Sequence, residues 1–168
     1  MKEVKYNDYA KEALDGLAKG AFLNVSHEGQ DNTMTIGWGS ISYIWRKPVF
    51  MGMVRYSRHT YKMLDEAREF AVSIPFGDNF KQELALCGTK SGRDIDKFQS
   101  CNFQAVRANK VNAPLISGCN LHYECRVLYK QVLDPAALET GLSNKFYGND
   151  DLHVLYYAEI VGTYLEDN

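Results

Sequence analysis

Segments typical of β-strands outnumber helical segments in this chain, and the two kinds do not alternate regularly. A parallel sheet needs a crossover, usually a helix, after nearly every strand. The order found here is instead typical of an antiparallel sheet whose strands follow one another through turns. We therefore expect a mainly β fold, an antiparallel β-barrel with a few flanking helices.

Six segments carry the strand pattern, at residues 21–27, 34–44, 49–54, 69–75, 119–132 and 152–164. Residues 28–32 are expected to form a turn, and residues 135–147 a helical or irregular excursion. Helices are expected at residues 8–19 and 79–87, and from Ser57 to about residue 68. Asn7 and Ser57 are suitable N-caps for the helices that follow them. Gly37 and Gly39 are unusual inside a strand and indicate a bulge or a close approach to the backbone.

The bulk properties limit the class of protein. A length of 168 residues fits one domain, residues 1–168. A net charge of −2 and a pI near 6.1 exclude the strong positive field that non-specific nucleic-acid binding requires. We see no apolar run of signal-peptide or membrane-spanning length, which predicts a cytoplasmic protein without membrane contact.

The four cysteines do not suggest a metal site. Cys87, Cys101, Cys119 and Cys125 have no C-x-x-C spacing and no histidine at zinc-ligand spacing. In a reducing compartment they are expected to be thiols. Their roles stay open, although Cys87 precedes a polar loop that has binding character.

The segment Arg55-x-Ser57-Arg58-x-Thr60 joins a strand to a helix. The first N–H groups of a helix lack intrahelical partners and carry the positive end of its dipole, so they bind anions. Two guanidinium groups and two hydroxyls add charge-assisted hydrogen bonds. A capped surface helix whose arginines pair with Asp65 or Glu66 explains the same spacing equally well.

Two further segments have binding character. Residues 32–39 open with polar side chains and include two glycines, so a flat heterocycle could pair with their backbone; a strongly curved barrel strand is the simpler explanation. Residues 89–98 form a loop dense in hydrogen-bond donors but without a nucleotide P-loop pattern. Taken alone, that loop is best explained as solvated surface.

Taken together and in this order, the segments resemble the flavin reductase-like family, the FMN-binding split β-barrels that include the flavoredoxins. The matching stretches are Lys19–Leu23, Asn32–Trp38, Trp45–Pro48, Val54–Thr60, Cys87–Phe98 and His153–Val161. The resemblance implies a six-stranded antiparallel split barrel. It also implies a homodimer with FMN near the subunit interface.

The resemblance assigns a role to particular residues. It implies that the FMN phosphate is held by Arg55, Ser57, Arg58 and Thr60. The isoalloxazine ring would be lined, largely through backbone groups, by Met34, Thr35 and Ile36, with Asn32 supporting the turn. The loop closing over the cofactor would contain Lys90, Ser91 and Gly92, with Asp94 and Lys97 as second-rank candidates.

The activity implied is that of an NAD(P)H-dependent flavin oxidoreductase. A nicotinamide, from NADH or NADPH, would give hydride to the flavin nitrogen N5, and no catalytic side chain is required. Electrons would then pass to free flavin, a metal complex or a small redox protein. Two alternatives stay open: a flavoredoxin-type electron carrier reduced by a protein partner, and a split barrel that binds haem or another ligand.

Overall fold

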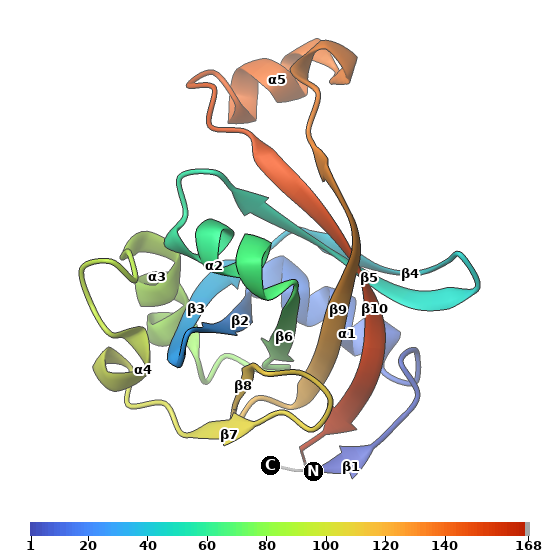
Figure 1. Cartoon of the computed structure of the whole chain (residues 1–168), viewed down its shortest axis with the longest axis vertical. Helices are drawn as coiled ribbons and strands as arrows, with labels where there is room; N and C mark the ends of the chain where they lie inside the picture. The colour runs from blue at the N-terminus through green and yellow to red at the C-terminus, as the bar shows by residue number, and fades with distance from the viewer. Residues whose placement is uncertain (167–168) are drawn as a thin grey trace.

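A computed structural model describes residues 1–166 as a curved antiparallel sheet with helices packed around it (Figure 1). The main sheet has eight strands: β1 (Lys2–Glu3), β2 (Ala21–His27), β3 (Gln30–Ile36), β4 (Gly39–Ile44), β5 (Lys47–Arg55), β6 (Glu69–Ile74), β9 (Leu121–Val132) and β10 (His153–Leu165). Their order is β3-β2-β6-β9-β10-β5-β4, with β1 paired to β10. All of these pairs are antiparallel. The expectation of a mainly β antiparallel fold is confirmed.

Short elements cover this sheet. They are the helices α1 (Ala10–Lys19), α2 (His59–Ala67), α3 (Lys81–Thr89), α4 (Lys97–Ser100) and α5 (Thr140–Phe146), the 3₁₀ turn η1 (Pro135–Ala137), and a two-stranded sheet of β7 (Ala105–Arg107) and β8 (Pro114–Ile116). Figure 1 shows α5 beyond the ends of β9 and β10, away from the other helices, and β1 beside the last residues of β10. The helices α2, α3 and α4 lie on the side of β2 and β3.

Two expectations about the strands were wrong. Among residues 1–166 the main sheet contains eight strands rather than six. Its two ends, β3 and β4, do not pair with each other, which agrees with the expected split barrel. Residues 34–44 are not one strand: β3 ends at Ile36 and pairs with β2, whereas β4 begins at Gly39 and pairs with β5. A Cβ atom at Gly39 would lie 2.7 Å from the Met51 carbonyl oxygen. Glycine is therefore needed where the chain passes from one strand ladder to the other.

The boundaries of three other segments also differ from the sequence prediction. Residues 30–32, expected in a turn, belong to β3, so the turn is confined to Glu28 and Gly29. Ser57 is not an N-cap, because α2 begins at His59 after Arg58. Asn7 is not one either, because α1 begins at Ala10 after Tyr9, and neither helix has a side-chain cap.

The core lies inside the curved sheet. Its largest side chains come from strands distant in the sequence: Phe50 packs against Phe70 and Tyr123, with ring centroids 6.3 and 5.9 Å apart. Leu17 of α1 and Leu64 of α2 are buried against the same cluster. This packing fixes the end of β5 beside α2 and beside β3.

A buried cluster of polar groups joins four strands, β2, β6, β8 and β9. The Ser73 hydroxyl accepts hydrogen bonds from Asn24 Nδ2 at 3.0 Å and from the Ile116 amide at 3.1 Å. His122 Nδ1 lies 3.0 Å from the same oxygen, and its Nε2 lies 3.4 Å from the Glu166 carboxylate. Ser73 therefore satisfies polar groups of β2, β8 and β9 that have no access to water.

Replacing Ser73 with alanine is expected to lower the free energy of unfolding by about 2 kcal/mol, because buried donors lose their acceptor. Urea denaturation measures the change. Ser42→Ala is the matched control, since the Ser42 hydroxyl is only half-buried and makes one hydrogen bond, to the Val49 carbonyl at 3.2 Å. Equal losses in the two variants would contradict a special role for Ser73.

Candidate functional site

Two adjoining cavities lie where β3, the end of β5 and α2 meet the loop after α3. The larger, of about 370 Å³, lies between residues 55–60 and residues 89–93. The smaller, of about 140 Å³, lies along residues 34–38. Met34, Arg55 and Arg58 line both cavities, so together they form one elongated cleft.

The larger cavity contains the predicted anion site. α2 begins at His59, directly after the segment that carries the two arginines. Arg58 Nη1 donates to the Gly88 carbonyl at 2.7 Å, and Asn32 Nδ2 donates to Thr60 Oγ1 at 2.8 Å. These bonds tie the start of α2 to the end of α3 and to β3.

The arginines do not pair with α2. Asp65 bonds to Lys130 of β9 instead, and within residues 1–166 no ion pair joins Arg55 or Arg58 to Asp65 or Glu66. Arg55 instead donates to the Phe146 and Asp151 carbonyls, the former at 3.0 Å. The surface-helix explanation of this motif is therefore wrong.

The smaller cavity is bounded by the edge of the sheet. Among residues 1–166, β3 pairs only with β2 in the sheet, so its other edge carries backbone N–H and C=O groups without a strand partner there. The Thr35 hydroxyl donates to the Leu84 carbonyl at 2.6 Å, which ties this side chain to α3. Such an edge can hydrogen-bond to the polar rim of a flat heterocycle, as the sequence predicted.

The loop after α3 closes the cleft from the opposite side. Lys90, Ser91 and Gly92 line the larger cavity, as predicted. A Cβ atom at Gly92 would lie only 2.3 Å from Asn32 Oδ1, so the loop backbone packs directly on the Asn32 amide. Glycine is required at this contact.

Lys97 has a structural role beside the cleft. Its side chain is buried, and Nζ donates to the carbonyls of Thr33 at 2.8 Å and Cys87 at 3.0 Å. It therefore joins β3 to the end of α3. Burial lowers the pKa of Lys97, and the residue lines the larger cavity.

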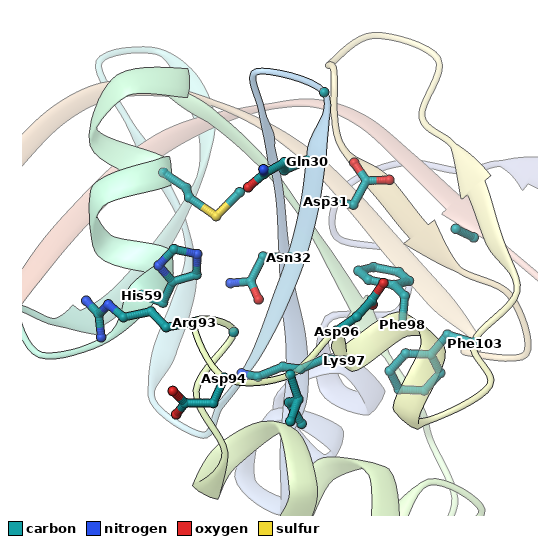
Figure 2. A pocket seen from close by; sticks show the side chains of 15 residues that line it. Gln30, Asp31, Asn32, His59, Arg93, Asp94, Asp96, Lys97, Phe98 and Phe103 are labelled. Atoms are coloured by element: carbon teal, nitrogen blue, oxygen red, sulfur yellow. The ribbon is translucent and has the colours of Figure 1, made fainter.

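Two predicted residues lie outside the cleft. Asn32 supports it from behind, through Thr60. Asp94 lines a third and larger cavity of about 610 Å³, together with Asn32, His59 and Gly92. Figure 2 shows this cavity, with His59 and Arg93 on one side and Phe98 and Phe103 on the other. The remaining predicted residues all line the elongated cleft: Met34, Thr35, Ile36, Arg55, Ser57, Arg58, Thr60, Lys90, Ser91, Gly92 and Lys97.

The sequence reasoning missed several residues that line the cleft. Trp38, Met53 and His153 line the smaller cavity, and Phe146, Asn149 and Asp151 line the larger one. His153 is paired with Arg55 in the β10–β5 register, so a correct prediction of that strand pair would have found it. Asp151 lies in the chain before β10, and no local pattern marks it.

His153 is neutral in this environment. Its Nδ1 lies 2.8 Å from the Tyr147 hydroxyl, and the Trp38 ring lies 5.2 Å from the imidazole. Burial, together with the nearby Arg55 guanidinium, lowers the pKa of His153 to about 4. An uncharged imidazole therefore borders the smaller cavity at neutral pH.

This lowered pKa predicts acid destabilisation. Because the unfolded histidine binds a proton near pH 6.5 and the folded one only near pH 4, stability is lost as pH falls through that window. From pH 7 to pH 5, the loss assigned to His153 is about 2 kcal/mol. Urea denaturation of His153→Gln should lack this part of the pH dependence, whereas His27→Gln should retain it. An unchanged pH profile in His153→Gln would contradict the assignment.

The cysteines show no activated thiol. Cys87 Sγ lies 3.9 Å from Cys101 Sγ, and all four cysteines are free. Burial raises the pKa of Cys87 to about 12 and raises that of Cys101, so both are protonated at neutral pH. Within residues 1–166, no cluster of histidine, cysteine, aspartate and glutamate could hold a metal ion.

Comparison with known proteins identifies the family. The profile of the flavin reductase like domain matches residues 14–168. The chain belongs to the flavin reductase-like family. An uncharacterised protein of Archaeoglobus fulgidus is 32% identical over 136 residues, which cover 80% of this chain and 71% of that protein.

Solved structures of flavin reductase-like proteins share the fold. Flavoredoxin from Methanosarcina acetivorans has a TM-score of 0.68 at 25% identity, covering 88% of this chain and 68% of that one. An FMN-binding protein from Thermus thermophilus has a TM-score of 0.71 at 21% identity, covering 89% and 72%. The described part of this flavin reductase-like chain contains no helix long and apolar enough to cross a membrane.

Proposed function

We propose that this protein binds FMN in the elongated cleft and acts as an NAD(P)H-dependent flavin oxidoreductase. The observation that supports this most directly is the continuity of the cleft. An unpaired strand edge suited to a flat ring lies at one end, and the arginine-rich start of α2 lies at the other. The family assignment supports the same ligand.

The residues present fit such a ligand. Arg55 at the end of β5, together with Ser57, Arg58 and Thr60 around the start of α2, would hold the phosphate, helped by the positive end of the helix dipole. The backbone from Met34 to Ile36 would hydrogen-bond to the ring. Glycine at position 92 lets the loop approach closely enough to cover the cofactor.

The chain contributes position and electrostatics to the reaction. Bound FMN would supply a ring nitrogen that accepts hydride from a nicotinamide. A backbone N–H group on the free edge of β3, at Thr35 or Ile36, would stabilise negative charge on the ring. His153, which is neutral, adds no positive charge beside it. Trp38, 40% exposed at the edge of the smaller cavity, would limit the space left for a nicotinamide.

A flavoredoxin-type electron carrier is the second candidate. It is favoured by the similarity to the Methanosarcina acetivorans flavoredoxin. Such a carrier would use the same cleft but receive electrons from a small redox protein. Neither candidate specifies the final electron acceptor.

The deciding experiment is anaerobic spectroscopy of the purified protein. The proposal expects a flavin spectrum after addition of FMN, and bleaching within the time of mixing when NADH or NADPH is added. Bound flavin that neither nicotinamide bleaches would refute the reductase role and favour the electron carrier. A haem spectrum, or no flavin binding, would refute both.

We further propose that the protein is a homodimer. Aromatic side chains are exposed on β4, on the turn between β4 and β5, and on β9: Tyr43 is 64% exposed, Trp45 56% and Tyr129 45%. The Trp45 ring lies 6.2 Å from Tyr129 and 6.4 Å from Tyr157. Exposed apolar patches of this kind mark protein–protein contacts.

Trp45→Glu is therefore expected to convert the protein from dimer to monomer, because it places a charge in the proposed apolar interface. Sedimentation equilibrium measures the change. Leu14→Glu is the control, since Leu14 is exposed on α1 and makes none of the ring contacts of this aromatic cluster. A wild-type protein that sediments as a monomer would contradict the dimer.

A further inference from the structure

The carboxylate of Asp151 occupies the donors of the predicted phosphate site. Ser57 donates to it twice, from its backbone N–H to Oδ1 at 3.2 Å and from its hydroxyl to Oδ2 at 2.7 Å. The Arg55 guanidinium lies 3.9 Å from the same carboxylate. These are two of the four residues expected to bind the phosphate. An anion of the chain itself therefore lies where the anion of the ligand is expected.

The position of Asp151 is fixed by regular structure on both sides. The Tyr56 amide donates to the Leu152 carbonyl at 3.2 Å, continuing the β5–β10 pairing that sets His153 opposite Arg55. Arg55 also donates to the carbonyls of Phe146 and Asp151. The strand register therefore holds the carboxylate beside Ser57, and its side chain is only 22% exposed.

The hydrogen-bond donors of Ser57 and Arg55 cannot bind the Asp151 carboxylate and a ligand phosphate at the same time without weakening one of the two interactions. A phosphomonoester carries a charge between −1.5 and −2 at neutral pH. Placing it beside an ionised carboxylate adds repulsion between like charges, which is stronger near a protein surface than in bulk water. The ring end of the cleft, at Met34 to Trp38, lies beyond the reach of these Ser57 contacts.

We propose that Asp151 is a specificity-determining residue that competes with the flavin phosphate for the donors of Ser57 and Arg55. It weakens the binding of FMN without weakening the binding of riboflavin, which has the same ring and no phosphate. The protein would therefore release FMN more readily than the same cleft would without this carboxylate. This inference rests on the proposed FMN site.

The test compares two flavins in three proteins. Asp151→Asn removes the charge and keeps the shape of the side chain. Asp150→Asn is the matched control, because Asp150 is the exposed neighbour and asparagine tolerates its φ of 58°. Dissociation constants for FMN and for riboflavin are measured by titrating the flavin fluorescence with each protein.

Asp151→Asn is expected to bind FMN at least about tenfold more tightly than wild type, and riboflavin within about twofold of wild type. Asp150→Asn should match wild type for both flavins. The unchanged riboflavin affinity also shows that the variant is folded.

Other results would overturn the inference. Unchanged or weaker FMN binding in Asp151→Asn would show that the carboxylate assists the phosphate or lies outside its site. An equal gain in affinity for FMN and for riboflavin would show that the substitution affects binding of the flavin ring and not of the phosphate. If none of the three proteins binds either flavin, both the proposed function and this inference are refuted. If wild type binds FMN, the proposed FMN site stands, and the comparison with Asp151→Asn tests the inference alone.

Discussion

Replacing Arg55 and Arg58 together with alanine is expected to weaken FMN binding at least about 100-fold, since each charge-assisted hydrogen bond to a phosphate contributes about 1.5–3 kcal/mol. Riboflavin binding should change far less, because riboflavin carries no phosphate. Fluorescence titration of both flavins measures the two affinities. The difference between them separates a lost phosphate contact from a disturbed fold.

The two arginines are not equivalent, so the single variants are informative. Arg58→Ala removes one hydrogen bond, to the Gly88 carbonyl. Arg55→Ala removes the hydrogen bonds to the Phe146 and Asp151 carbonyls, and so frees the segment that carries these two residues. Arg126→Ala is the control for loss of a positive charge, because its side chain is 57% exposed on β9. Unchanged FMN affinity in the double variant would refute the phosphate role.

The antiparallel fold could be predicted because its signal is local. Apolar and β-branched residues in short segments identify strands such as β2, β6 and β9 without knowledge of their partners. The break between β3 and β4 could not be predicted in this way. Gly37 and Gly39 indicated a bulge or a close approach to the backbone, but not a change of strand partner. Only the Met51 carbonyl, on a neighbouring strand, shows what approaches Gly39.

The same distinction applies to the cleft. The segment proposed to bind the phosphate could be predicted because strand end, arginines and helix start are consecutive in the sequence. The partners that modify it were not found because they are remote: Asp151 contacts Ser57 across 94 residues, and His153 reaches Arg55 only through the β10–β5 register. Ser57 was assigned as a helix cap on local grounds, but a distant carboxylate determines what its hydroxyl does.

Gly92→Ala is expected to weaken FMN binding about 10- to 100-fold, as an overpacked contact costs about 1–3 kcal/mol. The added methyl group would lie 2.3 Å from Asn32 Oδ1 and 3.0 Å from His59 Cδ2. The Asn32 side chain is buried and donates to Thr60 Oγ1, so either this bond breaks or the loop moves off the cleft. Fluorescence titration with FMN measures the loss.

Gly77→Ala is the matched control, because the nearest atom to its added methyl group is Asn79 Oδ1 at an ordinary 3.5 Å. A double-mutant cycle then identifies the cause. If the contact with Asn32 is responsible, Gly92→Ala should cost less affinity in an Asn32→Ala background, where the opposing amide is absent, than in wild type. Additive losses would instead mean that Gly92 serves loop flexibility, and the close contact between the loop and β3 would not control FMN binding.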